Sequence, residues 1–184
     1  MTTAAIEGLL DDLLTHDLGC APHVVVRIVS EVTADVSSVR AVARVLDQQQ
    51  RHGLRSLPSP LPMVDSIAAM FADLELVPRD RELLIAASMR LDDRLAPLLD
   101  FDGRSVDELA VCAVADLLVI HAGRVRLTDP RLAIWLRATT VPSAAARVHA
   151  RLHEVFQARG ERMDADWHRA RASMYGVPET ASEL

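Results

Sequence analysis

The chain has 184 residues, half of them hydrophobic but only 3% aromatic, and its formal net charge is −6. All 20 basic residues are arginine and the 7 glycines are scattered singly, which excludes a lysine-dependent phosphate site and a glycine-rich phosphate loop. The hydrophobic content argues against disorder, and the acidic balance argues against general nucleic-acid binding. A core of Leu, Val, Ala and Met favours many small helices.

Charge is distributed unevenly along the chain. Residues 1–120 hold 10 arginines against 19 acidic residues, a net of −9, whereas residues 121–184 hold 10 against 7, a net of +3. The basic half is therefore expected to face an acidic partner or the acidic half of the same chain.

Two features indicate a cytoplasmic protein. Cys20 and Cys112 are 92 positions apart, which predicts reduced thiols and no metal knuckle or redox pair. Residues 1–12 lack the basic start of a signal peptide, and no apolar run approaches the roughly 20 residues that span a membrane.

The first 60 residues are predicted to form a helical subdomain. Apolar side chains recur at helical spacing in residues 6–14, in 24–32 behind Pro22, and in 36–46. Prolines at positions 58, 60 and 62 then disfavour helix, which places an extended linker and a domain boundary near residue 60.

Residues 61–140 are predicted to form a winged-helix-like domain. Short helical patterns at 67–74, 83–87 and 95–99 precede a central stretch, 105–137. Ser105 and Glu108 match a capping box, and four residues are expected to form the buried stripe of the helix that follows. These are Val106, Leu109, Ala113 and Leu117.

The strongest β signal follows that helix. From Val119 the apolar period changes to two, and Ala122-Gly123 supplies a tight turn before a second alternating run, 124–128. Helices followed by a hairpin are the order of a winged helix.

The last part of the chain is predicted to be a pair of helices, one from Pro142 to Gly160 and one over residues 164–175, with Gly176 and Pro178 as stop signals. The predicted fold class is mainly α: a helical bundle plus a winged-helix-like unit with one β-hairpin, then a C-terminal helical pair. The predicted domains are 1–60, 61–140 and 141–184.

Catalytic and metal sites were sought at several positions. His16, Cys20 and His23 lie within eight residues and could ligate zinc, but they lack a clear fourth ligand. His149 and His153 share a helix face at i, i+4, although helix-surface or interhelical histidines are the simpler interpretation. We therefore predict no catalytic, cofactor or metal residues, with a small metal-dependent enzyme as the minor alternative.

DNA binding through the hairpin is the serious alternative function. The residues expected to contact a DNA backbone are Arg124, Arg126, Arg131 and Arg137. The preceding segment, however, carries Asp107, Glu108 and Asp116 and no arginine, so phosphates would repel it. DNA binding is accordingly allowed but not favoured.

The C-terminal run RVRLTDPRLAIWLRATTVPSAAARVHARLHEVFQARG, with DWHRARAS and GVPETASEL after it, resembles the large ATP-dependent LuxR-family regulators of actinobacteria, which belong to the STAND signalling NTPases. Upstream, LPSPLPMVDSIAAMF and SEVTADVSSVRAVARVL are similar to their proline-rich stretch and lid helix. The resemblance implies a helical lid, a winged helix and the first helical pair of a TPR-like sensor arm.

The chain departs from that family at several points. It has neither Walker motif nor the C-terminal helix-turn-helix of the family, and Asp129 replaces the histidine that precedes the proline. The resemblance thus implies a non-enzymatic regulatory or protein-interaction module, whose partner is another protein or the rest of a larger regulator, with a homodimer also allowed. The residues expected to bind the partner are Arg147, Arg151, Trp167 and His168.

Overall fold

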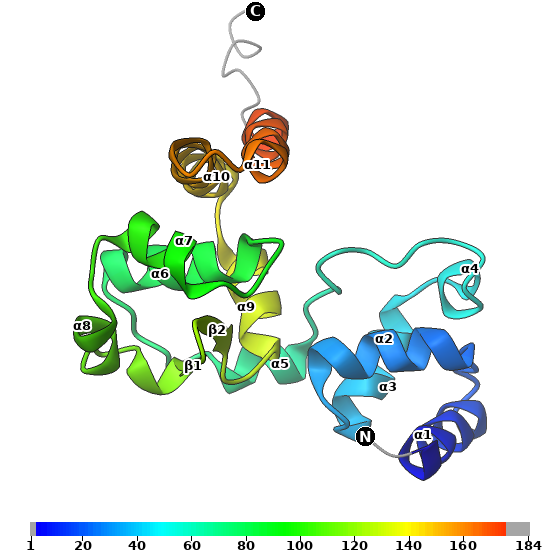
Figure 1. The fold of residues 1–184 in the computed structure, drawn as a ribbon. Coiled ribbons are helices and arrows are strands. Elements are labelled where there is room, and N and C mark those ends of the chain that lie inside the picture. Colours follow the sequence, from blue (N-terminus) through cyan, green and yellow to red (C-terminus); the bar gives the residue numbers. More distant parts are fainter. Residues whose placement is uncertain (1–2, 176–184) are drawn as a thin grey trace, which may run out of the picture. The chain divides into compact units, whose positions relative to one another are not determined.

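The structure is a computed structural model, and it describes residues 3–175. It is mainly helical with one antiparallel two-stranded hairpin, which confirms the predicted fold class (Figure 1). The expected stop signals Gly176 and Pro178, and the GVPETASEL segment, lie outside the described residues. In chain order the elements are α1 (Thr3–Thr15), α2 (Pro22–Val32), α3 (Val36–Val45), α4 (Gln48–Arg51), α5 (Asp65–Met70), α6 (Pro78–Met89), α7 (Leu95–Asp102), α8 (Val106–Ala110), the 3-10 helix η1 (Ala115–Leu117), β1 (Leu118–His121), β2 (Arg124–Leu127), α9 (Arg131–Thr139), α10 (Pro142–Ala158) and α11 (Arg162–Tyr175).

The chain forms two compact units. The N-terminal unit comprises Met1–Leu74 and Asp129–Ala138, and the C-terminal unit comprises Glu75–Thr128 and Thr139–Leu184. These limits differ from the boundaries expected near residues 60 and 140, because α5 and nearly all of α9 pack with the N-terminal helices.

The N-terminal unit is built on the apolar stripes that the sequence shows. Helix α2 starts at Pro22, whose ring presets the helical φ and whose missing N–H costs nothing at the first position. Its stripe is buried against α1 and α3. Phe71, just after α5, contacts Trp135 of α9 with ring centroids 5.9 Å apart, which ties these two distant segments together.

Asp35 caps helix α3. Its carboxylate accepts hydrogen bonds from the Ser38 N–H at 2.9 Å and the Ser37 hydroxyl at 2.7 Å. Hydrogen bonds from Ser38 and then Ser37 lower the pKa of Asp35 from 3.8 to about 2, because they stabilise the ionised form. The cap satisfies donors that the first turn of the helix leaves unpaired.

We expect Asp35→Ala to lower the free energy of unfolding by about 1 kcal/mol near neutral pH. A carboxyl with a depressed pKa stabilises the fold above its unfolded pKa and loses that effect as the pH falls toward the folded value. The difference from wild type should therefore shrink between pH 4 and pH 2. Urea unfolding across this range tests it, with the exposed Asp73→Ala as control, and a difference that is constant with pH would contradict it.

The C-terminal unit begins with the helices α6, α7 and α8, which precede the hairpin β1–β2. The strands pair antiparallel with Leu118 opposite Leu127 and His121 opposite Arg124. The expected turn is present, with φ of 48° at Ala122 and 73° at Gly123. Two consecutive positive φ values match the right-handed twist of the strands, which fixes the register predicted from the alternating pattern.

The helix expected after Ser105 is shorter than predicted. Its capping box with Glu108 forms, but α8 ends at Ala110. Of the expected buried stripe only Leu109 is buried, because Val106 and Ala113 are exposed and Leu117 is half-buried. The Leu109 carbonyl accepts from the backbone N–H of Cys112 and from its thiol, a three-residue turn that does not continue the α-helical ladder. A turn and η1 then carry Val114 into the core ahead of β1.

Helices α10 and α11 lie side by side as the predicted C-terminal pair (Figure 1). A proline and a positive-φ glycine bound α10 where the sequence places them, with Pro142 at its start and Gly160 after its end. Within residues 3–175, no helix combines the length and the apolar character that crossing a membrane requires.

Candidate functional site

The hairpin is held by residues 90–95, here called the clamp segment, which run from the end of α6 to the first residue of α7. The Val125 N–H donates to the Asp93 carbonyl at 2.7 Å, and the Leu95 N–H donates to the Gly123 carbonyl at 2.8 Å. The clamp segment therefore extends the hairpin as a third, irregular edge. This contact satisfies outward-facing donors and acceptors that a free β2 would leave unpaired.

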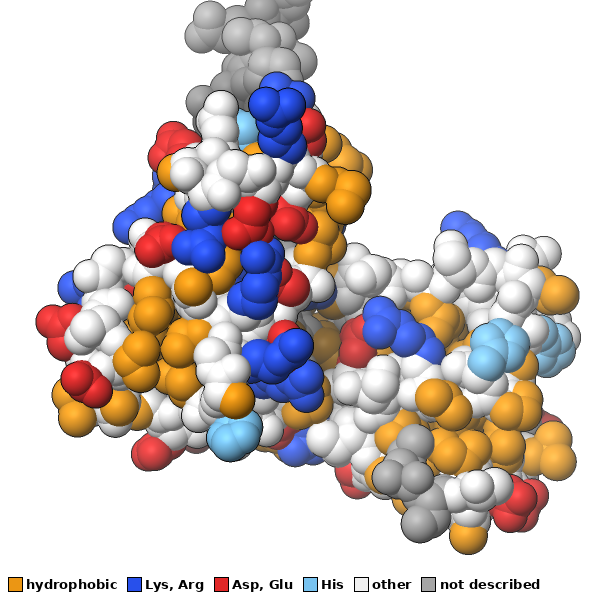
Figure 2. Space-filling model, in the orientation of Figure 1, with side chains coloured by type: hydrophobic (Ala, Val, Ile, Leu, Met, Phe, Trp, Pro, Cys, Tyr) orange, Lys and Arg blue, Asp and Glu red, His pale blue; other side chains and the backbone are white. Residues whose placement is uncertain are grey.

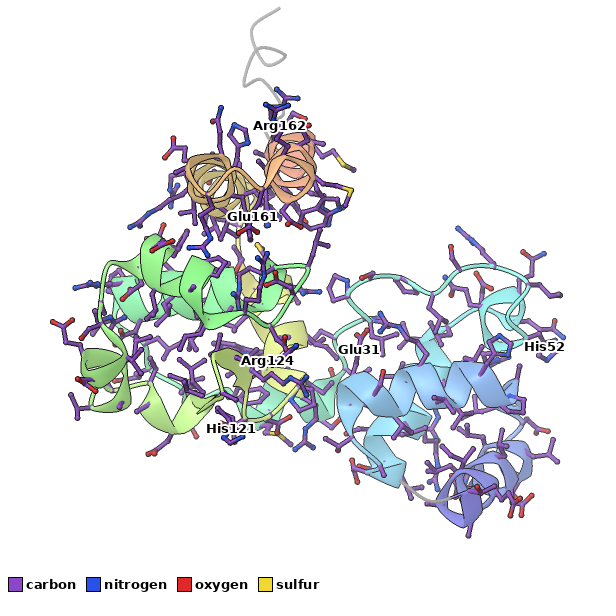
Figure 3. The ribbon with its side chains drawn as sticks, viewed as in Figure 1. Glu31, His52, His121, Arg124, Glu161 and Arg162 are labelled. Atoms are coloured by element: carbon purple, nitrogen blue, oxygen red, sulfur yellow. The ribbon has the colours of Figure 1, made fainter. Side chains whose placement is uncertain are left out.

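Arg124 and Arg126 of the hairpin both bind the Asp93 carboxylate of the clamp segment. Asp93 accepts from Arg126 Nε at 2.8 Å and Nη2 at 2.6 Å, and its other oxygen accepts from Arg124. Hydrogen bonding by Arg126, followed by the charge and hydrogen bond of Arg124, lowers the pKa of Asp93. Figure 3 shows Arg124 at the hairpin. Both side chains remain exposed, and the two arginines share the single negative charge of Asp93.

The other two arginines expected to contact DNA lie on α9, in the N-terminal unit. Arg131 forms hydrogen bonds with Asp129 at 2.6–3.1 Å, and these raise its pKa. Arg137 is partly buried in the same helix. Two of the four arginines therefore belong to each unit.

The clamp segment also binds the helical pair. Arg94 donates to Glu161, at the start of α11, and lies 3.6 Å from the Asp164 carboxylate. Figure 3 shows Glu161 on the side of the pair nearer α7, whereas Arg162 points away. The buried Arg90 guanidinium donates to the Arg94 carbonyl, which fixes the path of the chain after α6.

Two buried histidines join α10 to α11. His149 Nδ1 lies 2.8 Å from His168 Nδ1, and both side chains are almost completely buried. His168 also stacks on Phe156, with centroids 5.3 Å apart, and His149 stacks on Tyr175 at 5.7 Å. Burial, and then the nearby His149 and Arg90, lower the pKa of His168 from 6.5 to about 3. This centre is structural, and it matches the interhelical interpretation of His149.

The buried pair predicts that acid weakens the fold. His168 is neutral in the folded protein down to about pH 3, whereas the unfolded chain binds its proton near pH 6.5. The free energy of unfolding should fall as the pH decreases from about 6.5 toward 3, by up to about 1.4 kcal/mol per pH unit.

His168→Asn keeps a hydrogen-bonding group near the Nδ1 position but cannot be protonated in this range. We expect it to flatten the pH dependence of unfolding between pH 6.5 and 4, measured by urea denaturation, whatever its effect at pH 7. The exposed His121→Asn serves as the control. Equal slopes for wild type and His168→Asn would contradict the assignment.

The four residues expected to bind a partner occupy different environments. Arg147 is exposed on α10, and Arg151 pairs with Glu82 at 3.5 Å while its guanidinium lies 4.5 Å from the centre of the Phe101 ring. Trp167 is half-buried on α11. His168 is fully buried, so its inclusion was wrong: a partner cannot reach a side chain enclosed between two helices.

Helix α11 also carries an apolar stripe, whose Trp167 ring contacts both histidines, with centroids 5.5 Å from His149 and 4.8 Å from His168. Met163, Trp167 and Met174 follow the helical spacing i, i+4, i+11, and the methionines are 85% and 68% exposed. The Arg171 guanidinium lies 5.5 Å from the centre of the Trp167 ring. Hydrophobic side chains show at the edge of this helical pair in Figure 2. A solvated helix face usually carries polar residues here, so this stripe is unusual.

A groove of about 570 Å³ runs between the N-terminal parts of α6 and α10. Ile85, Ala144 and Val148 form its apolar base. Three arginines and one glutamate also line it, namely Arg79, Arg81, Arg147 and Glu82. Sequence reasoning singled out Arg147 but missed the groove, because its two sides are about 60 residues apart in the chain.

The candidate metal ligands do not converge. His16 Nδ1 contacts the Asp12 carbonyl, and the Cys20 thiol donates to the Leu18 carbonyl. The His23 ring lies so close to Gly53 that a Cβ atom at position 53 would be 2.2 Å from it. His153 Nδ1 contacts the Ala165 carbonyl. Among residues 3–175, no group of three His, Cys, Asp or Glu side chains is placed to hold a metal ion.

No protein-family model matches the sequence, and comparisons with curated proteins and with solved structures likewise found no match. The geometry of these surfaces is therefore the basis for assigning a function.

Proposed function

We propose that this protein is a non-enzymatic regulatory module that acts through protein contacts made by the α10–α11 pair. The observation that carries the proposal is the apolar stripe on α11, which consists of the exposed Met163 and Met174 and the half-buried Trp167. Methionine and tryptophan are favoured where one surface must bury apolar area against a partner, because methionine adapts its shape and tryptophan supplies a large contact area.

The partner segment that best fits this stripe is an amphipathic helix with acidic flanks. A helix face with apolar residues at helical spacing pairs with the apolar face of another helix. Residues 142–175 hold six arginines against four acidic residues, which leaves a surplus of positive charge to attract acidic flanks. The proposal places the protein among cytoplasmic regulators, in keeping with two free cysteines and with the resemblance to the arm region of LuxR-type regulators.

Photo-cross-linking in cells tests the proposal. A photoreactive residue at position 163 or 174 should capture the same protein, whereas one at Leu54, equally exposed in the N-terminal unit, should not. With that partner purified, Met163→Asp should weaken binding at least about tenfold, because it places a charge in an apolar contact. Val111→Asp, at an equally exposed apolar position, is the matched control.

Two results would contradict the proposal. One is capture of the same set of proteins from positions 163 and 54. The other is an affinity that Met163→Asp and Val111→Asp change equally.

DNA binding by the hairpin remains the second candidate, because three helices and a hairpin follow one another in the C-terminal unit. The pairing of Arg124 and Arg126 with Asp93 argues against it. We expect no salt-dependent binding to duplex DNA by fluorescence anisotropy at 50–200 mM salt, a range over which phosphate contacts have large effects. Asp93→Asn should create weak binding by freeing the arginines. Wild-type binding that Arg124→Ala with Arg126→Ala abolishes would establish the DNA function instead.

A further inference from the structure

We infer that the groove between α6 and α10 binds a small amphipathic organic acid, with its anionic group at Arg147 and its apolar body on Ile85, Ala144 and Val148. This inference is independent of the partner surface proposed on α11. It rests on the size of the groove, its apolar base and the charges at its rim.

The groove has the dimensions and composition of a small-ligand site. Ligand pockets commonly enclose about 300–1,000 Å³ and combine an apolar lining with a few polar groups that set orientation. This groove encloses about 570 Å³. Ile85 and Val148 are 4% and 1% exposed, so the base is part of the packed core and is in place before any ligand arrives. Ala144, with the exposed Pro78 and Val141, supplies apolar lining that a ligand can reach.

The charges at the rim favour an anion. Arg79 lies 3.5 Å from the Asp102 carboxylate, and the Glu82 carboxylate pairs with Arg151, so these charges are balanced within the unit. The Arg81 guanidinium donates to the Thr139 Oγ1 at 2.9 Å and to the Thr139 carbonyl at 3.3 Å, which orients the arginine side chain. With Arg147, the lining of the groove holds three arginines against one glutamate.

Arg147 is the residue that singles out an anionic ligand. It is exposed at the rim, one residue before the buried Val148, and has neither a hydrogen bond nor an ion pair with any residue in the described part of the chain. A guanidinium binds a carboxylate or phosphate through two parallel hydrogen bonds. In a ligand with one such group and an apolar chain, the anionic group would bind Arg147 while the chain covers the apolar base of the groove.

Isothermal titration calorimetry with octanoate, octyl phosphate and 1-octanol on the full chain tests the inference. Octanoate or octyl phosphate should bind, and 1-octanol should bind at least about tenfold more weakly, because it lacks the charge that Arg147 recognises. The stronger of the two anions identifies the preferred head group.

Three variants locate the site. Arg147→Gln should weaken anion binding at least about tenfold and leave 1-octanol unaffected. Ala144→Phe should block all three probes by filling the groove. Arg169→Gln, which removes an exposed arginine paired with Asp166 on α11, should change nothing.

The inference fails if neither anion binds at millimolar concentration, or if 1-octanol binds as tightly as octanoate. It also fails if Arg147→Gln and Arg169→Gln have equal effects, or if Ala144→Phe binds octanoate normally while its circular dichroism matches wild type. None of these outcomes bears on the α11 stripe, which is tested by cross-linking.

Discussion

The arrangement of the C-terminal unit depends on the clamp segment, residues 90–95. Its backbone pairs with the hairpin through Asp93 and Leu95, while its side chains reach the hairpin through Asp93 and α11 through Arg94. An isolated two-stranded hairpin is marginally stable in water, so these contacts explain how β1–β2 keeps a fixed position. One stretch of six residues therefore connects the hairpin to the helical pair.

This connection determines how the hairpin should be interpreted. As a sequence motif, a hairpin with two arginines behind three helices indicates a DNA-binding wing. In the structure, the same arginines bind Asp93, and the helix before the hairpin is a short acidic turn that exposes Asp107 and Glu108. The contacts with Asp93 brace the hairpin within the unit, and the surfaces that we propose for binding lie on α6, α10 and α11. The apolar stripe and the arginine-lined groove lie on those helices.

The sequence predicted features that depend on local spacing. Pro22 and Pro142 begin their helices where expected, and Ala122-Gly123 forms the turn, because each depends on the φ values that a few neighbouring residues allow. The sequence overestimates the length of α8, because Ala113 stands four residues after the buried Leu109, as a continuing helix would require. In the structure, Val114 is the residue that enters the core.

The contacts of the candidate site were harder to predict because they join distant residues. Asp93 is 31 and 33 positions from the arginines it binds, and His149 is 19 from His168. One signal for the histidines was present: His149 continues the buried spacing of Ala145, Leu152 and Phe156 along α10. Nothing comparable in the sequence marks the groove, whose sides meet only once α6 and α10 pack.

Amide hydrogen exchange at Val125 and Leu95 tests most directly whether the clamp segment holds the hairpin. Both N–H groups donate across this contact, and neither bond belongs to the β1–β2 ladder or to a helix. The structure predicts that both amides exchange about as slowly as those within the hairpin, and that Asp93→Asn accelerates both together. Exchange of Val125 and Leu95 at the rate of an exposed loop, while the β1–β2 amides stay protected, would show a hairpin free of the clamp segment and contradict the account.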